Sequence, residues 1–186
     1  MKPVTVISGK VAVLDRSDVD TDQIIPKQFL KRIERTGFGE FLFYDWVRSG
    51  EVTLERAPIL VAGRNFGCGS SREHAVWAIQ DFGYQAVVAP SFSDIFFANC
   101  TKCGVLPIAL PEEDVRALMG AREATIDLAA QTVTFAGRSA SFEIDAETKH
   151  RLLNGLDEIG LTLQHEDEIT AYERARARAG VATTSL

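Results

Sequence analysis

The stretch PILVAGRNFGCGSSREHAVWAIQDFGYQAVVAP, residues 58–90, decides the fold. It opens on the apolar run PILVA and closes on QAVVAP, and short runs of this kind are typical of buried strands. Between them, Ala75, Ile79 and Phe82 recur at i, i+4 and i+7, which predicts one apolar helix face, and Gly83 is suited to end that helix. Strand, helix and strand with short connections are typical of a parallel sheet covered by helices.

The same alternation continues towards the C-terminus. SDIFFANCTKCG, residues 93–104, predicts a second helix that ends at a glycine, and VLPIAL, residues 105–110, predicts a third strand. PEEDVRALMG, residues 111–120, begins with acidic residues and favours a further helix. Residues 124–145 then alternate apolar and polar side chains over short runs, as antiparallel strands do, and the remaining tail has a helical pattern.

The N-terminal part is less regular. VTVISGKVAVLD, residues 4–15, predicts one or two strands, and RSDVDTDQIIPKQFL, residues 16–30, contains an Asp-rich loop that ends at Pro26. GFGEFLFYDWVRSG, residues 37–50, predicts a short aromatic helix that Gly50 ends.

We therefore expect an α/β fold with a small parallel or mixed sheet flanked by helices, followed by a strand-and-helix C-terminal extension. A length of 186 residues and a hydrophobic fraction of 46% are sufficient for one domain with a real core. The change of pattern near Gly120 predicts a core over residues 1–120 and an extension of strands and then helices over residues 121–186.

Composition and charge narrow the class of protein. The net charge of −6 leaves no basic surplus to neutralise phosphates, which argues against nucleic acid as the main partner. Apolar runs such as QAVVAP fall far short of the roughly 20 residues that span a membrane. Because the N-terminus carries no pattern of a secretory signal, we expect a cytoplasmic protein whose three cysteines are free thiols.

The loop between the first strand and helix of residues 58–90 has the features of an anion site. The first N–H groups of a helix have no internal partner, and the helix dipole is positive there. We expect the helix to begin at Ser70 or Ser71, with Ser70 and Glu73 forming a capping box. A cap alone does not require Gly69 and Gly67, which allow the backbone to approach a ligand closely.

Arg72 decides between two classes of anion. GCGSSR resembles the start of G-x-G-x-x-G, but Arg72 stands at the third glycine position, and the lysine of a P-loop is absent. A cation in the first turn opposes the helix dipole unless it forks onto an anion. One arginine, two hydroxyls and backbone N–H groups suit a small di- or tri-acid better than a nucleotide. A non-catalytic module that binds a small acid or phosphate stays open at this point.

Three separated motifs, in order, span about residues 10–110: DTDQIIP at 20–26, GRNFGCGSSREHAVWAI at 63–79 and SFSDIFFANCTKCGVLPI at 91–108. Together they resemble the small subunits of 3-isopropylmalate dehydratases, the swivel-domain members of the aconitase family. GSSRE with an upstream DTDxI is far more specific than a glycine-rich loop alone. The resemblance implies isomerisation of 2-isopropylmalate to 3-isopropylmalate by dehydration and rehydration, a hydro-lyase step of leucine biosynthesis.

The resemblance also assigns roles to residues of this chain. Ser70, the first serine of GSSRE, corresponds to the base that takes a proton from carbon. Arg72 corresponds to the arginine that binds a substrate carboxylate, and Ser71 and Gly69 lie at the same carboxylate. Asp22 matches an aspartate that lines the site. An alkoxide base is plausible only where a helix dipole, backbone donors and cations stabilise it, and the residues beside Ser70 can supply these.

The family places a [4Fe–4S] cluster, the Lewis acid for the departing hydroxyl, on a separate large subunit. Cys68, Cys100 and Cys103 could suggest a cluster on this chain, but the last two fall inside a predicted helix and no further ligand supports them. We therefore expect no metal on this chain, a large subunit as partner and a dicarboxylate as substrate. His74, in the first turn of the helix, is expected to be a structural neighbour of the site rather than a general acid.

The segment after DTDQIIP is where the family is expected to sense the substrate side chain. Phe29 and Leu30 offer apolar contact to an isopropyl group, and Lys31 follows them. The alternative, that Phe29 and Leu30 anchor the loop in the core, is equally compatible with the sequence. A related family member that acts on citraconate or homoaconitate would carry the same loop with another specificity segment.

Overall fold

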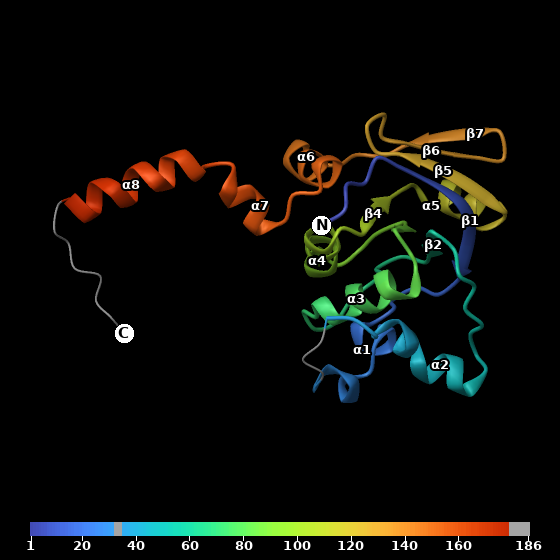
Figure 1. Cartoon of the computed structure of the whole chain (residues 1–186). Coiled ribbons are helices and arrows are strands. Elements are labelled where there is room, and N and C mark those ends of the chain that lie inside the picture. Colours follow the sequence, from blue (N-terminus) through green and yellow to red (C-terminus); the bar gives the residue numbers. More distant parts are fainter. Residues whose placement is uncertain (32–34, 179–186) are drawn as a thin grey trace.

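The computed structural model describes residues 1–31 and 35–178, and it is built around one seven-stranded mixed sheet (Figure 1). The strands are β1 (Val6–Leu14), β2 (Ile59–Ala62), β3 (Ala86–Ala89), β4 (Leu106–Ala109), β5 (Glu123–Asp127), β6 (Thr132–Phe135) and β7 (Arg138–Ser141). The helices are α1 (Thr21–Ile24), α2 (Tyr44–Ser49), α3 (Glu73–Phe82), α4 (Asp94–Cys103), α5 (Glu112–Met119), α6 (Ala146–Asn154), α7 (Glu158–Leu163) and α8 (Glu166–Arg178), with 3₁₀ turns η1 (Lys27–Lys31) and η2 (Gly39–Phe41).

The sheet has a parallel half and an antiparallel half that meet in β1. Its strand order is β4-β3-β2-β1-β5-β6-β7. The second part of β1, from Val11 to Leu14, pairs in parallel with β2, whereas the first part, from Val6 to Lys10, pairs antiparallel with β5. The α/β fold with a mixed sheet and flanking helices, expected from the sequence, is therefore confirmed.

Two hydrophobic cores lie on the two faces of the parallel strands. Leu60 of β2 belongs to the core that also contains residues of α1, α3 and α4, whereas Ile59 and Val61 belong to the core that contains residues of α5 and α6. All four residues of β2 and of β3 are buried. Strands covered on both faces read as continuous apolar runs, which is why PILVA and QAVVAP identified them.

The start of α3 differs from the expectation. The helix begins at Glu73, its N-cap residue is the extended Arg72, and no side chain caps it, so the predicted start at Ser70 or Ser71 and the capping box were wrong. A capping box does form in α1, inside a segment that the sequence indicated as a loop. The Asp20 side chain accepts a hydrogen bond from the backbone of the first turn, and the Gln23 side chain accepts one from the Asp20 N–H. The predicted end of α3 is confirmed, since Gly83 is its C-cap residue with a φ of 119°.

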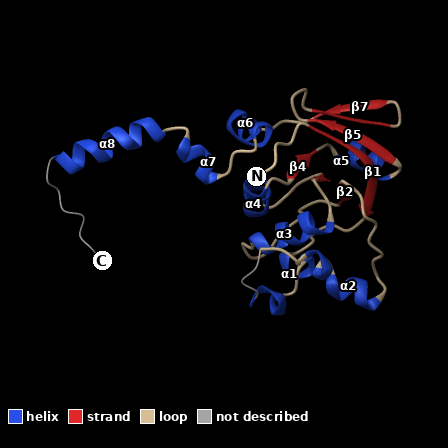
Figure 2. Cartoon of the chain, in the orientation of Figure 1, coloured by secondary structure: helices blue, strands red, loops and turns tan. Residues whose placement is uncertain are grey.

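The C-terminal region divides into strands that join the sheet and helices that leave it. β5 pairs with β1 across the boundary predicted near Gly120, and that boundary stays a prediction. The helices α7 and α8 project away from the body (Figure 2). Residues 179–186 of the predicted extension lie outside the described residues. Across the described residues, the helices are too short or too polar to cross a membrane.

Candidate active site

The loop of residues 63–72 follows β2 at its carboxyl end and leads into α3. Three alternate residues in it have a left-handed backbone, with φ values of 54° at Asn65, 76° at Gly67 and 92° at Gly69. L-residues with a side chain rarely adopt this region, and glycine does so without steric cost. The alternation folds the loop tightly against its neighbours.

The segment around α1 holds one side of this loop by its backbone. The Gly67 N–H donates to the Val19 carbonyl at 2.8 Å, and the Thr21 N–H donates to the Cys68 carbonyl, also at 2.8 Å. The Thr21 hydroxyl donates to the Ser70 carbonyl at 3.0 Å. These bonds bring the DTD and GSSRE motifs together and keep Ser70 out of the helix.

Residues 91–93 hold the other side. The Phe66 N–H donates to the Ser91 carbonyl at 3.0 Å, and the Ser93 N–H donates to the Phe66 carbonyl at 3.1 Å. The Ser93 hydroxyl donates to the Gly67 carbonyl at 2.6 Å. Each intramolecular hydrogen bond contributes about 1 kcal/mol net, so the loop backbone is held firmly between two segments distant in sequence.

The two glycines before the serines have a packing role. A Cβ atom on Gly67 would overlap the ring of the buried Phe96, and one on Gly69 would overlap the carboxylate of Asp20, the N-cap residue of α1. The sequence suggested that both glycines make room for a ligand. The close approaches in the structure are instead to the chain's own side chains, and a contact between Gly69 and a ligand stays a prediction.

Ser70 and Ser71 are both exposed at the end of this loop. The Ser70 carbonyl is bound by Thr21, but no side chain in residues 1–31 or 35–178 hydrogen-bonds the Ser70 hydroxyl. A rigid backbone therefore presents a hydroxyl that is available to another molecule.

Arg72 lies next to these serines and forms a forked ion pair with Asp22. Both terminal nitrogens of Arg72 donate to the Asp22 carboxylate, and the contact between Nη2 and Oδ2 measures 3.1 Å. The Arg72 side chain is only 16% exposed, whereas that of Asp22 is 50% exposed. The hydrogen bond from Arg72 is the largest cause that lowers the pKa of Asp22, and burial opposes it. Arg72 is thus shaped to bind a carboxylate, and Asp22 supplies one.

The structure therefore brings together the predicted residues Ser70, Ser71, Arg72, Gly69 and Asp22. Sequence reasoning gave no role of their own to Asp20 and Thr21, and it placed Lys27 only in the specificity segment after DTDQIIP. Asp20 packs on Gly69, Thr21 binds the loop, and the cation of Lys27 also lowers the pKa of Asp22. The D-x-x-Q pattern of a capping box was the signal that would have placed a helix at α1.

The predicted specificity segment is η1. The Phe29 ring stacks on Phe41 with centroids 4.0 Å apart and meets Tyr44 edge-on at 4.9 Å. Leu30 is half-buried and packs against the core, and Lys31 is exposed. These contacts favour the anchoring alternative for Phe29, while substrate contact by Leu30 or Lys31 stays a prediction.

His74 lies half-buried among aromatic rings. Its ring centroid is 5.3 Å from that of Phe38 and 4.5 Å from that of Trp77. Burial lowers the pKa of His74, which favours a neutral ring at physiological pH. This environment supports a packing role for His74.

The cysteines lie in different environments. Burial, followed by the charges of Asp20 and Asp18, raises the pKa of the Cys68 thiol, and burial raises that of Cys100 well above its ordinary value. Among the described residues, no group of three or more His, Cys, Asp or Glu side chains is arranged to hold a metal ion. The described residues therefore offer no donor set that fits an iron–sulfur cluster.

Residues 50–113 match the family model of the aconitase C-terminal domain, and residues 158–179 match that of the C-terminal domain of 3-isopropylmalate dehydratase small subunits. The 3-isopropylmalate dehydratase small subunit of Rhodopirellula baltica is 56% identical over 195 residues, covering 95% of this chain and 100% of its own. That of Rubrobacter xylanophilus is 55% identical over 189 residues, covering 96% and 97%. The chain belongs to the 3-isopropylmalate dehydratase small subunit family.

A solved structure of this family has the same fold. The crystal structure of 3-isopropylmalate dehydratase from Methanocaldococcus jannaschii matches with a TM-score of 0.71 at 27% sequence identity. The match covers 90% of this chain and 99% of the archaeal chain.

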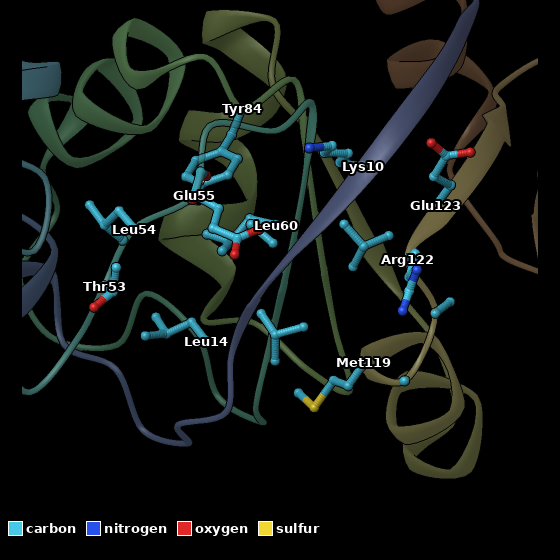
Figure 3. A pocket seen from close by; sticks show the side chains of 15 residues that line it. Lys10, Leu14, Thr53, Leu54, Glu55, Leu60, Tyr84, Met119, Arg122 and Glu123 are labelled. Atoms are coloured by element: carbon cyan, nitrogen blue, oxygen red, sulfur yellow. Dashed lines mark hydrogen bonds between the residues drawn. The ribbon is translucent and has the colours of Figure 1, made fainter.

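Three of the candidate site residues of this family member, Ser70, Ser71 and Asp22, are exposed. A cavity of about 660 Å³ lies elsewhere, beside β1 and the start of β5, and Figure 3 shows Leu14, Leu54, Met119 and Arg122 in its lining. Ser70, Arg72 and Asp22 are not among its lining residues. An exposed hydroxyl and a half-exposed ion pair do not exclude water, so the chemistry of such a site requires a second surface to cover it.

Proposed function

We propose that this chain is the small subunit of a 3-isopropylmalate dehydratase, a hydro-lyase that converts 2-isopropylmalate to 3-isopropylmalate in leucine biosynthesis. Two relatives of that name are 56% and 55% identical to it over almost the whole chain. The observation that carries the mechanism is the fork of Arg72 on a carboxylate, beside the exposed hydroxyl of Ser70.

In this proposal Arg72 binds one carboxylate of the substrate. In the structure the Arg72 fork is filled by Asp22, so a substrate carboxylate displaces Asp22 or shares the guanidinium with it. Ser71 and the Gly69 backbone contribute further polar contacts to the same carboxylate. The Arg72 side chain is largely buried, which strengthens the interaction because less water competes for the guanidinium.

Ser70 acts as the base. Its oxygen takes the proton from one carbon of the substrate as the hydroxyl leaves the neighbouring carbon, and the two carbons form the double bond of the alkene. Rehydration returns the proton and the hydroxyl to exchanged positions. A serine alkoxide is costly, and here the nearby Arg72 guanidinium and the positive end of α3 lower that cost.

The chain does not complete the reaction alone. A [4Fe–4S] cluster on the large subunit supplies the Lewis acid for the leaving hydroxyl. The large subunit also covers the open surface around Ser70 and excludes water from it. We place the assembled enzyme in the cytoplasm.

Mixing the purified chain with a cluster-loaded large subunit under anaerobic conditions tests this function. The ultraviolet absorbance of the alkene would be followed in separate assays with 2-isopropylmalate, with citraconate and with homoaconitate. We expect turnover only from the mixture, with 2-isopropylmalate as the preferred acid.

Other outcomes would revise the function. Preference for citraconate or homoaconitate would keep the chemistry and change the substrate. Micromolar binding of a small acid by the isolated chain, with no turnover from any mixture, would establish a non-catalytic binding module instead.

A further inference from the structure

The two C-terminal helices form an arm, Glu158–Arg178, that projects from the body (Figure 1). Only its base is tied down in the described part of the chain, where Arg151 donates to Glu158 at 2.8 Å. From Thr162 to Arg176 every described side chain is exposed, apart from a half-buried Thr170. The arm is thus ordered as helix without being packed against its own domain.

The arm exposes large apolar side chains at a density unlike the rest of the surface. Ile159 is 71% exposed, Leu163 57%, Ile169 38% and Tyr172 65%. In α8, Ile169, Tyr172 and Arg176 recur at i, i+3 and i+7 and share one face, which we call the arm stripe. Tyrosine and arginine are the residue types enriched at the energetic centres of protein interfaces.

The length of α8 indicates that something else stabilises it. A helix of 13 residues is marginal in water on its own, even with a favourable composition. Acidic residues in its first turn, such as Glu166, complement the helix dipole, but each such charge contributes only about 0.3–1 kcal/mol. Most helices in proteins are stabilised by packing of an apolar face, and the arm stripe is the face available for it.

The two matching family models indicate the occupant of that face. The model named for aconitase covers residues 50–113, which contain the catalytic loop. The model named for the dehydratase small subunit covers residues 158–179, which are the arm. The segment that matches the model named for the small subunit is therefore the arm, which projects away from the rest of the domain. Separate chains need a contact that holds them together.

We propose that the arm stripe docks on the large subunit and holds the two chains together. The proposal rests on the proposed function for the existence of that subunit. The complementary surface on the large subunit is an apolar groove for Ile169 and Tyr172, with an acidic group facing Arg176. The arm then sets the affinity of assembly, whereas the loop of residues 63–72 sets the chemistry.

The test compares two full-length variants with a matched control. Ile169→Glu and Tyr172→Glu place a charge in the arm stripe and keep a good helix former at the position. Ala171→Glu adds the same charge to an exposed position of the same helix, about 130° around its axis from the middle of the arm stripe. The affinity of each for the large subunit would be measured by biolayer interferometry, together with kcat at saturating small subunit.

Each stripe variant is expected to raise the dissociation constant for the large subunit by at least about tenfold. Ala171→Glu should bind about as tightly as wild type. At concentrations that restore assembly, kcat should equal the wild-type value. Unchanged affinity in both stripe variants would overturn the proposal. So would loss of self-association by the stripe variants with unchanged affinity for the large subunit, which would make the stripe a contact between copies of this chain. Tight wild-type binding without turnover would instead contradict the proposed function. The affinities of the stripe variants would then still decide whether the arm stripe docks on the large subunit.

Discussion

The loop of residues 63–72 and the arm of residues 158–178 both present side chains to the outside, and they do so in opposite ways. The loop backbone is bound on both sides by hydrogen bonds and by glycines packed against Phe96 and Asp20, and the serines at its end are exposed. The arm has ordered helices, but almost none of its side chains is covered. A substitution should therefore act on stability in the loop backbone, on chemistry at the loop end and on assembly in the arm.

The largest effect on stability is expected from Gly67→Ala, which would disrupt the packing that distinguishes the loop from the arm. The new Cβ overlaps the Phe96 ring and the residue keeps a φ of 76°, so we expect a loss of about 2–5 kcal/mol. Gly137→Ala is the matched control, because Gly137 has a similar φ of 74° and nothing within 4 Å. It should cost about 1–2 kcal/mol. Denaturant unfolding of both variants measures the difference, and equal losses would show that the loop is not tightly packed.

Arg72→Lys should separate chemistry from folding at the loop end. Lysine keeps the charge but loses the fork that binds a carboxylate, so KM of the assembled enzyme should rise by about 10- to 100-fold while stability changes by less than about 1 kcal/mol. Steady-state kinetics and thermal unfolding of the same preparation would provide both values. A collapse of stability with KM unchanged would make Arg72 a structural residue like those of the loop backbone.

Asp22→Asn tests whether Asp22 competes with substrate for Arg72. Removing its charge should tighten binding of a malate-type dianion to the isolated chain by about two- to fivefold, the range of a partly exposed ion pair. Isothermal titration calorimetry measures this, and weaker binding would mean that Asp22 contacts the ligand or positions Arg72.

The same pair makes a prediction about pH. Because Arg72 lowers the pKa of Asp22 from 3.8, the contribution of the ion pair is present above that pH and is lost as the pH falls through the lower folded value. The ratio of variant to wild-type affinity should therefore be constant between about pH 6 and about pH 8. A ratio that changed in this range would show that Asp22 titrates there.

The smallest effect is expected at Cys68. Burial raises the pKa of the Cys68 thiol, so the reactive thiolate is scarcer at neutral pH than for a free thiol; alkylation should be correspondingly slower and should rise steadily with pH. Cys68→Ala should keep activity within about twofold, since the thiol is assigned no role in the chemistry. Rapid alkylation with loss of activity at neutral pH would contradict this environment.

Much of the α/β core followed from local patterns. The strands predicted from PILVA and QAVVAP, β2 and β3, are buried throughout, and glycines end α2, α3 and α4 as the sequence indicated. The predicted start of α3 was wrong because Ser70 lies outside the helix, where its carbonyl accepts a hydrogen bond from Thr21, 49 residues away in sequence. No local signal reports such a contact.

The motif predicted which residues would lie near one another at the candidate site, but not how they are arranged. The motif identified Ser70, Arg72 and Asp22, and the structure brings them together. The sequence did not indicate that Asp22 fills the Arg72 fork, because the two residues are 50 positions apart. Nor did it reveal that Gly69 makes room for Asp20, since a left-handed glycine beside a ligand and one beside a side chain look alike in sequence.

The most direct test of the account is the kcat of the assembled enzyme with Ser70→Ala, measured at a saturating concentration of the variant. Ser70 is exposed and its hydroxyl has no hydrogen-bond partner in residues 1–31 or 35–178, so stability and affinity for the large subunit should equal those of wild type. If Ser70 is the base, kcat should fall by about 10²–10⁴-fold. Full activity in a stable, assembled Ser70→Ala enzyme would contradict the assignment of Ser70 as the base.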